Sequence, residues 1–550
     1  MDNDNLYLPS REDVQDAKNT VEYPPIGLDF GTSNSVLAHY TDEFHRRGAY
    51  AYALPLLNGG NVFPSIVYYN NEQNRYETGT AAKIRQLIES EAVATSIKRK
   101  ISLEYIDIAG RNVSPIDLMS YIISGLLREV RSTELTMMPT VITMTVPYYF
   151  KQSQNYRLQQ AAKQAFNDVF GKEYKIEVIP EPVAAAIDYI CNRNTRRNIS
   201  QTILIYDIGG GTCDVTIVRY SLSGSRLEFE VLGIDGDETL GGDDIDHLLF
   251  EYICNENNID IDKLHSEPRY TKTIATLLDD ARSVKESLSI QEDYNLVRPS
   301  LYVNNSYINI DTVITRQVLN DILRNQKRPK KNDSVIDALD AAIKRLKLKT
   351  HNVKVDLLLP IGGTSSIPVV QKVVKDNYPD SEHVNLPNID SQVSVARGAA
   401  IYSALHDQRN LHPLGQSIHD ISIKMRVAHS LSVAMYDGRL VKLINSNSPA
   451  PYKATKRFYA TRSDASKQFI KLSTIELYQG EGRTTSSENV ELVGRIDLSK
   501  YQLYTHDRDL KDIPFQVTFK ADATNLEAQI IADGVNQDKT DLIINETIKL

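Results

Sequence analysis

The sequence predicts an α/β protein that contains one folding unit twice, followed by a β-sandwich, and three observations lead to this prediction. Residues 24–40 (PPIGLDFGTSNSVLAHY) read as an apolar strand, a polar turn and a second strand, and residues 202–219 (TILIYDIGGGTCDVTIVR) repeat the pattern. Strands rich in Val, Ile and Tyr alternate with helical periodicity up to residue 405. After residue 420 only strand-like alternation remains.

The two hairpin-like segments share more than their turns. Each has an aspartate at the end of its first strand, Asp29 and Asp207. Glycine between two strands is usually ordinary turn chemistry, but two copies with an acid in the same place favour a duplicated fold. Helical patterns at 115–130, 152–170 and 271–289 fill the spaces between the predicted strands.

The C-terminal region alternates between apolar and polar residues. Leu431 and Val433 alternate with Ser430 and Ser432 ahead of an Asp-Gly turn, and the segment 515–520 (FQVTFK) alternates in the same way. Hairpins with one buried face are typical of a sandwich. We therefore divide the chain into a flexible tail (1–20), an α/β domain (21–405), a polar linker (406–420) and a β-sandwich (421–550).

Composition narrows the classes of function. The chain has 550 residues, 41% hydrophobic and 24% charged, with a net charge of −9. This balance argues against binding to nucleic acid or to an anionic membrane. No apolar run reaches the ~18–20 residues of a membrane span, and the N-terminus lacks a secretory pattern. The widely spaced Cys191, Cys213 and Cys254 suit reduced thiols, so we expect a cytoplasmic protein.

The hairpin turns carry residues suited to phosphate. Glycine lets the backbone approach an anion, and successive N–H groups form an anion nest. The residues that would supply these groups are Gly31, Thr32, Ser33, Asn34, Gly209, Gly210, Gly211 and Thr212. Asp29 and Asp207 would face each other across a cleft, where carboxylates suit Mg²⁺ held through its waters. ATP hydrolysis requires such positioning and little covalent chemistry.

A third glycine element and two helices complete this pattern. Residues 355–370 (VDLLLPIGGTSSIPVV) predict a strand, a glycine turn and a helix that starts near Pro368, which places a helix N-terminus where a nucleotide could lie. The segments 181–190 and 394–405 are helical and rich in Ala and Gly, so their axes could approach closely. Glu181 opens the first of them, either as a favoured N-terminal acid or as a ligand of a metal-bound water.

In this order the motifs resemble the seventy-kilodalton heat-shock chaperone family (DnaK-type), within the actin–hexokinase–chaperone superfamily. GLDFGTSNS and IYDIGGGTCDVTIV look like its two phosphate loops, and PEPVAAA and SVARGAA like its connecting helices. LGGDDID and LLLPIGGTSSIPVVQ are similar to its other nucleotide-domain signatures. Residues 442–464, 475–499 and 514–530 resemble its peptide-binding β-subdomain. The resemblance spans nearly the whole chain.

The resemblance implies a two-lobed actin-like ATPase with duplicated ribonuclease-H-like sheets, followed by a β-sandwich that grips extended peptide. It implies ATP or ADP and Mg²⁺ as ligands. By position it assigns catalytic roles to Asp29, Lys98, Glu181, Asp207 and Asp214, with Asp29 and Asp207 holding Mg²⁺ through water. It adds to the phosphate-loop residues a further set of nucleotide-binding residues: Gly241, Gly242, Lys285, Ser289, Gly362, Gly363 and Thr364.

The chain departs from the family where the base and the co-chaperone bind. The two arginines that sandwich adenine correspond to Glu286 and Ser366, and a usually acidic nucleoside contact corresponds to Arg282. Glu177 takes the place of the arginine that contacts J-domain co-chaperones. The linker lacks an apolar docking run. We expect poor base selectivity and altered coupling between the domains.

In the β-domain the resemblance assigns the peptide site. Val433, Phe458 and Ile475 would line the pocket, unless they are ordinary sandwich core, and Tyr436 would arch over the peptide. Ser473 stands where the family has an aliphatic residue. The sequence stops after the last predicted strand, so we expect no helical lid. Such a site holds peptide by main-chain hydrogen bonds and a side-chain pocket.

Three functions remain open. The first is a chaperone-like, slow Mg²⁺-dependent ATPase that binds unfolded polypeptide. The second is a nucleotide-dependent switch or scaffold that holds one dedicated protein partner, which the altered base site and Glu177 keep open. The third is a sugar-kinase-type transferase, which the β-domain argues against.

Overall fold

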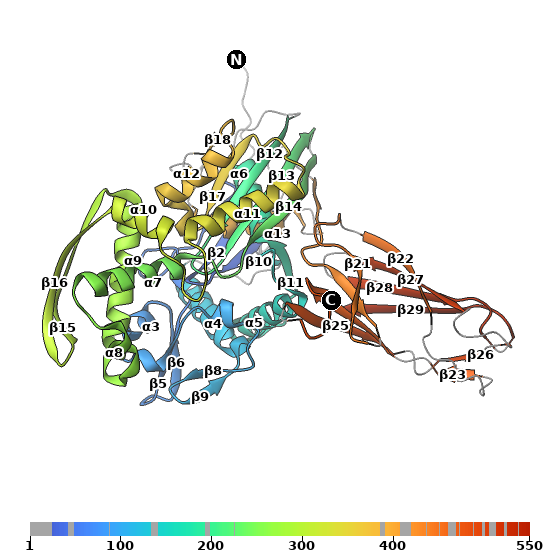
Figure 1. Ribbon diagram of the computed structural model, residues 1–550, viewed down its shortest axis with the longest axis horizontal. Helices are drawn as coiled ribbons and strands as arrows, with labels where there is room; N and C mark the ends of the chain where they lie inside the picture. Colours follow the sequence, from blue (N-terminus) through green and yellow to red (C-terminus); the bar gives the residue numbers. More distant parts are fainter. Residues whose placement is uncertain are drawn as a thin grey trace, which may run out of the picture.

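The computed structural model describes the chain from residue 25 to residue 549. It leaves out 42–48, 87, 134–140, 193–198, 225, 385–390, 407–419, 436, 450–451, 460–468, 472–473, 488, 498–500, 505, 507–512, 522–524 and 537. The predicted tail, nearly all of the predicted linker, Tyr436 and Ser473 therefore lie outside the described residues. The described part forms a two-lobed α/β body with a β-sandwich beside it (Figure 1).

The first lobe is built on a mixed sheet with the order β11-β10-β1-β2-β3, and β4 pairs with β2. β1 and β2 form the first predicted hairpin, and β1 and β10 are parallel. The strands are β1 (Ile26–Phe30), β2 (Asn34–Tyr40), β3 (Ala51–Ala53), β4 (Phe63–Pro64), β10 (Ile142–Val146) and β11 (Ile176–Pro180). Two helices, α4 (Pro115–Thr133) and α5 (Gln152–Phe170), pack on one face of the sheet in a shared apolar core.

A small α/β extension of the first lobe flanks the cleft. Its strands are β5 (Val67–Asn70), β6 (Arg75–Thr78), β7 (Val93–Ala94), β8 (Ile106–Ile108) and β9 (Arg111–Val113). Its helical segments are α3 (Gly79–Gln86), η1 (Ser90–Ala92) and η2 (Ile97–Lys100).

The second lobe repeats the first. Its sheet has the order β18-β17-β12-β13-β14-β19, with an antiparallel β12–β13 hairpin and a parallel β12–β17 pair. The strands are β12 (Ile199–Ile208), β13 (Cys213–Ser223), β14 (Arg226–Asp237), β17 (Leu357–Ile361), β18 (Glu382–His383) and β19 (Asp420–Lys424). The same hairpin with the same parallel neighbour in both lobes confirms the predicted α/β duplication.

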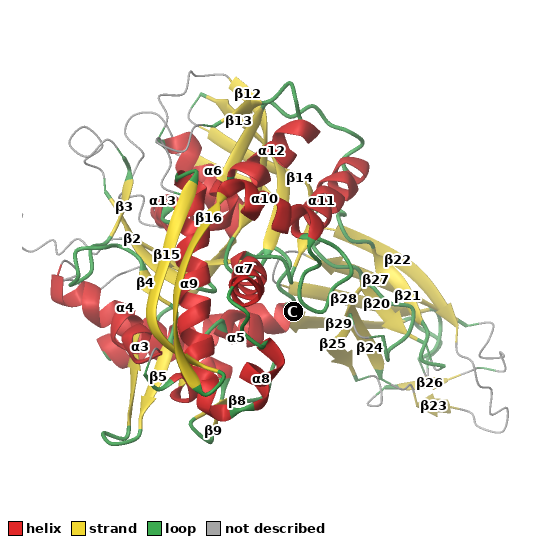
Figure 2. Cartoon of the chain, turned by 60° about the vertical axis from the view of Figure 1, so that its left-hand side comes forward, coloured by secondary structure: helices red, strands yellow, loops and turns green. Residues whose placement is uncertain are grey.

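The helices of the second lobe share one apolar core with this sheet. They are α7 (Gly242–Glu256), α8 (Ile261–Ser266), η3 (Pro268–Tyr270), α9 (Thr271–Ile290), α10 (Arg316–Asn325), α11 (Val335–Lys349) and α12 (Pro368–Asn377), the last preceded by η4 (Gly363–Ser366). Of these, α11 and α12 pack directly on the strands of the sheet. Pro368 starts α12, as the sequence predicts. The hairpin of β15 (Asp293–Val303) and β16 (Ser306–Thr315) lies over α9 (Figure 2).

Two helices rich in small residues join the lobes. α6 (Glu181–Cys191) and α13 (Ser394–Leu405) pack against each other in a core that also takes side chains from β2 and β12. A β-carbon on Gly398 would lie 1.7 Å from the carbonyl oxygen of Ala184. The buried Asp188 accepts hydrogen bonds from Arg397 at 2.8 and 2.7 Å and from Ser394 at 2.9 Å.

The C-terminal region is the predicted β-sandwich, with two antiparallel sheets of four strands around one core. One sheet contains β20 (Leu431–Ala434), β21 (Leu440–Ile444), β24 (Ile475–Gly480) and β25 (Val490–Ile496). The other contains β22 (Tyr452–Tyr459), β27 (Pro514–Ala521), β28 (Asn525–Ala532) and β29 (Leu542–Lys549). A separate pair joins β23 (Phe469–Lys471) and β26 (Gln502–Tyr504).

The segment 420–424 does not belong to the sandwich, although the sequence analysis starts the sandwich at residue 421. It pairs in parallel with β14, from Arg226↔Asp420 to Glu230↔Lys424, and so extends the sheet of the second lobe rather than a sheet of the sandwich. Ile421 is buried in the core between the lobes. Two apolar residues that follow the predicted linker, Ile421 and Ile423, thus pack against the core between the lobes.

Substitution of Gly398 by Ala is expected to lower the free energy of unfolding by about 1–3 kcal/mol or more, because the added carbon must push α13 away from the backbone of α6. Urea unfolding followed by circular dichroism measures this loss. Gly60→Ala is the control, because Gly60 is exposed and the nearest atom to its new carbon is the flexible Asn58 side chain. Equal stability of both variants would contradict the close helix crossing.

Candidate nucleotide site and docked β-domain

A cavity of about 970 Å³ lies between the lobes, and most of the predicted nucleotide residues line it. From the first lobe they are Asp29, Gly31, Thr32, Ser33, Asn34, Lys98 and Glu181. From the second lobe they are Asp207, Gly209, Gly210, Thr212, Lys285, Ser289, Gly362, Gly363 and Thr364. The duplicated hairpins thus present their turns to one shared space.

The two hairpin turns contact each other closely. A β-carbon on Gly210 would lie 2.2 Å from the hydroxyl oxygen of Ser33, and one on Gly211 would meet Arg99 at 2.6 Å. The predicted residues Gly211, Gly241 and Gly242 do not line the cavity, and a β-carbon on Gly241 would lie 2.5 Å from the Gly210 carbonyl oxygen. These glycines therefore allow the loops to pack, while their neighbours line the cavity.

The third glycine element closes the same wall. Gly362 has φ 76°, in the left-handed region, and a β-carbon there would come within 2.7 Å of the Asp207 carboxylate. Thr364 donates a hydrogen bond to the Gly209 carbonyl oxygen at 3.0 Å. The strand, turn and helix predicted for 355–370 are therefore confirmed, with a 3₁₀ turn between β17 and α12.

Buried charge is concentrated at one end of the cavity. Lys98, 5% exposed, donates a hydrogen bond of 2.6 Å to Glu181. Burial alone would lower the pKa of Lys98, but the charges of Glu181 and Asp29 raise it. Burial and then the charge of Glu181 raise the pKa of Asp29 to about 6, although Thr145 donates a hydrogen bond to it at 2.9 Å.

The other two acids are in a similar environment. Burial, followed by the charges of Glu181 and Asp29, raises the pKa of Asp207 well above its usual range. Burial, followed by the charges of Glu181 and Asp207, does the same for Asp214. Asp214 lines an adjoining cavity of about 340 Å³ that shares Thr32, Lys98 and Thr212 with the larger one. Four carboxylates thus gather around one lysine.

This cluster fits a cation held through water. In the described part of the chain, no three His, Cys, Asp or Glu side chains are spaced to hold a metal ion directly. The excess of buried carboxylates still favours positive charge, and Oδ1 of Asp214 is buried without a hydrogen-bond partner among the described residues. Mg²⁺ usually keeps several of its waters, which suits this arrangement.

The nucleoside side of the cavity is rich in ion pairs. On α9, Lys285 lies 2.7 Å from Asp246 and donates to the Gly242 carbonyl oxygen at 3.1 Å, and Arg282 lies 3.2 Å from Asp246. Glu286 and Ser366 line the same cavity, and the Ser366 hydroxyl donates to the Gly363 carbonyl oxygen at 2.6 Å.

Sequence reasoning missed a clamp across the cleft. Ser96 in the first lobe donates a hydrogen bond of 2.8 Å to Asp243 at the start of α7 in the second lobe. Arg99 approaches the same carboxylate at 3.8 Å. Ser96 has a left-handed backbone, φ 52°, directly before η2, which is a feature of the structure and not one that the sequence shows.

The β-domain places its predicted peptide residues at or near its core. Val433 is 5% exposed on β20, and Phe458 on β22 and Ile475 on β24 are partly buried against the same core. Their burial fits both interpretations, a peptide pocket and ordinary sandwich core. Glu177 lies on the edge strand β11 and pairs with Lys175 at 2.9 Å.

The β-domain is docked on the first lobe. The Tyr148 hydroxyl donates to the Arg426 carbonyl oxygen at 2.8 Å, and the Gln152 amide donates to the Gln479 side chain at 3.3 Å. His429 contacts the Tyr149 carbonyl oxygen through Nε2 at 2.5 Å. The docking loop 147–151 contains Phe150, whose ring centre lies 5.9 Å from the Lys98 ammonium.

Comparison with known proteins identifies the family. The model of the Hsp70 protein family matches residues 104–546. The chain belongs to the Hsp70 family. It is 28% identical over 534 residues to the chaperone protein DnaK of Mycoplasmopsis pulmonis (strain UAB CTIP), covering 96% of this chain and 79% of that protein. It is also 28% identical over 529 residues to the chaperone protein DnaK of Mycoplasma mycoides subsp. mycoides SC, covering 94% and 79%.

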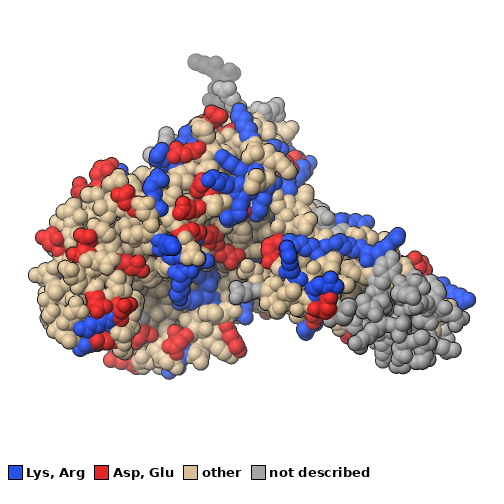
Figure 3. Space-filling view, viewed as in Figure 1, with Lys and Arg blue, Asp and Glu red and all other residues tan. Residues whose placement is uncertain are grey.

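None of the described helices of this Hsp70-family chain is long and apolar enough to cross a membrane. Acidic and basic side chains are interspersed over the face drawn in Figure 3.

Acidification is expected to weaken docking of the β-domain. Burial lowers the pKa of His429 below 6.5, and the nearby Lys151 also lowers it, while the Tyr149 carbonyl, Glu238 and Glu481 oppose this. Protonation of His429 is therefore less favourable in the docked state than in the undocked state. The full free energy of docking is available above pH 6.5. It decreases as the pH falls below that value, by up to about 1.4 kcal/mol per pH unit.

Fluorescence energy transfer between dyes on the lobe and on the sandwich measures docking between pH 7.5 and 5.5. His429→Gln keeps a side-chain donor without a titrating group, so its docking should depend less on pH. Identical pH profiles for the two proteins would exclude His429 as the source.

Proposed function

We propose that this protein binds ATP and hydrolyses it slowly with Mg²⁺, and binds extended polypeptide through its β-domain. The single observation that carries the proposal is the meeting of two duplicated glycine turns, each with a buried aspartate, at one interlobe cavity. Membership in the Hsp70 family, whose members are ATPases, supports it.

The residues suggest a division of labour in hydrolysis. The amides of the two glycine turns bind the phosphates, with Thr32 and Thr212 beside them. Lys98, held by Glu181, places a positive charge near the terminal phosphate. Mg²⁺, when bound near Asp29 and Asp207, neutralises charge that develops on the phosphates.

We infer that Asp214 orients the attacking water. It is buried, its Oδ1 is unpaired among the described residues, and it lines the smaller cavity that adjoins the phosphate site. Burial raises the pKa of Asp214 well above its usual range, which is the direction expected for an acid–base group.

A second candidate is a nucleotide-dependent switch for one dedicated protein partner. It is favoured by Glu286 and Ser366, which line the cavity where arginines would contact the base in relatives. Peptide arrays with and without ATP separate the two functions. Binding to many apolar segments supports the chaperone, and binding to one partner alone supports the switch.

Asp207→Asn and Lys98→Ala are each expected to lower Mg²⁺-dependent ATP turnover by about 10²-fold or more, because hydrolysis depends on positioning and electrostatics. A phosphate-release assay measures turnover, and circular dichroism checks the fold. Lys163→Ala is the control, because this lysine is exposed on α5 and does not line the cavity. Unchanged turnover in the Asp207 or Lys98 variant would reject the assigned roles.

Weak discrimination between ATP and GTP is expected. A guanidinium stacked on a base contributes about 0.5–2 kcal/mol, and the wall has Glu286 and Ser366 instead, while Arg282 is engaged with Asp246. Calorimetry with both nucleotides measures the ratio. Tight binding that strongly prefers adenine would show that another group reads the base.

A further inference from the structure

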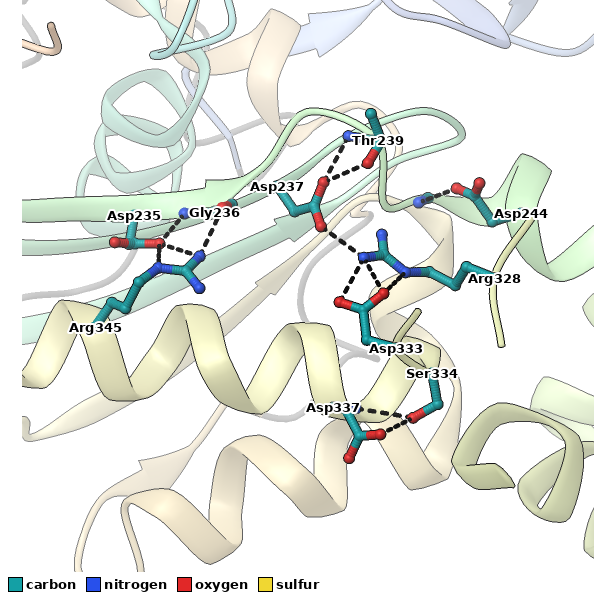
Figure 4. Close-up of polar contacts among 11 residues, drawn as sticks. Asp235, Gly236, Asp237, Thr239, Asp244, Arg328, Asp333, Ser334, Asp337 and Arg345 are labelled. Atoms are coloured by element: carbon teal, nitrogen blue, oxygen red, sulfur yellow. Dashed lines mark hydrogen bonds and ion pairs between the residues drawn. The ribbon is translucent and has the colours of Figure 1, made fainter. Parts of the chain in front are cut away.

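The loop between α10 and α11, residues 326–334, carries a buried arginine. Arg328 is 2% exposed. It donates to both carboxylate oxygens of Asp333, at 2.8 and 2.9 Å, and pairs with Asp237 at 2.9 Å (Figure 4). A guanidinium is withdrawn from water only at a high cost unless such bonds compensate it. These contacts therefore hold the loop in one place.

The loop is anchored to the turn that leads into α7. Asp237, the last residue of β14, also accepts hydrogen bonds from the amide and the hydroxyl of Thr239, at 2.8 and 2.7 Å. The same turn continues to Gly242, whose amide donates to the Gly209 carbonyl oxygen at 2.9 Å. Arg328 thus fixes the loop to the phosphate-loop side of the second lobe.

Lys330, two residues further along, lines the interlobe cavity. Its φ of 58° lies in the left-handed region, which few non-glycine residues adopt. The turn is closed by the Lys331 amide, which donates to the Arg328 carbonyl oxygen at 3.0 Å. The anchored loop therefore determines where the Lys330 side chain stands.

Lys330 has no carboxylate partner in the described part of the chain. Lys98, Lys285 and Arg282 at the same wall lie 2.6, 2.7 and 3.2 Å from carboxylates. Lys83 and Lys100 also line the cavity and, like Lys330, have no ion pair among the described residues. Lys330 is exposed, and no ion pair of its ammonium group occurs among the residues that the structure describes. An unpaired ammonium at the wall of a cavity is available to an anionic ligand.

We propose that Lys330 contacts the nucleotide in the cleft, meeting the negative charge of a nucleoside di- or triphosphate, and that Arg328 positions it. This inference rests on the proposed nucleotide-binding function. Because an ammonium group attracts the polyphosphate whatever the base, Lys330 contributes to affinity and not to base selectivity.

Calorimetry with MgADP, at low and at high KCl, tests the contact. Lys330→Ala should weaken binding about fivefold and make the affinity less dependent on salt, as expected for loss of one partly exposed charge contact. Lys331→Ala removes the adjacent exposed lysine, which does not line the cavity, and should bind like the wild type. The ratio of ADP to GDP affinity should be the same in all three proteins.

Arg328→Met tests the positioning role. It should weaken MgADP binding to a similar extent, and adding Lys330→Ala to it should cause little further loss, since the two residues act through one contact. Additive losses would show that Arg328 acts on the cleft independently of Lys330. If the Arg328→Met variant does not fold, the Lys330→Ala variant by itself tests the contact, because Lys330 is exposed.

Failure of the Lys330 contact and failure of the proposed function give different results. Wild-type protein that binds MgADP, with equal affinity and salt dependence in Lys330→Ala, would overturn the Lys330 contact and leave the proposed function intact. Wild-type protein that binds neither MgADP nor MgATP would overturn both.

Discussion

The contact between α6 and α13 brings two helix backbones so close that only glycine fits at residue 398. Asp188 and Arg397 add a buried ion pair to the same crossing, with Asp188 1% exposed. One core between the two sheets results, with residues from both lobes. Glu181, the first residue of α6, is thereby carried to the place where the ends of β1 and β12 present Asp29 and Asp207.

The cleft made in this way contains more buried negative charge than its own lysine neutralises. Burial raises the pKa of three aspartates there, so ionisation of these carboxyl groups is disfavoured. Strain of this kind is concentrated at functional sites, where a bound cation relieves it. The Lys98–Glu181 pair is the one direct compensation among these groups, and removing either partner would leave the other buried without it.

The second lobe is also joined to the β-domain through the backbone of β19. β19 continues the sheet in register beside β14, and Arg426, two residues later, donates to the carbonyl oxygens of Val231 and Asn447 at 2.7 and 2.8 Å. The sandwich is therefore held by the sheet of one lobe and the docking loop of the other. If the angle between the lobes changes, the sandwich must move with them, or one of its two attachments must break.

Local pattern alone determined much of this protein. Alternation predicted the sandwich, glycine turns after apolar strands predicted both hairpins, and Asp29 and Asp207 were found because each ends a strand in the repeated unit. These signals depend on neighbours in the sequence, where backbone geometry and burial periodicity are encoded.

Tertiary structure decided the rest, because it depends on which distant segments pack together. The Ser96–Asp243 clamp and the Thr145–Asp29 hydrogen bond join residues far apart in the chain. The pairing of residues 420–424 with β14 could not be predicted, because this segment is short and is flanked by polar residues. Lys330 is an ordinary loop lysine in the sequence, and only the burial of Arg328 against Asp237 brings it to the cleft.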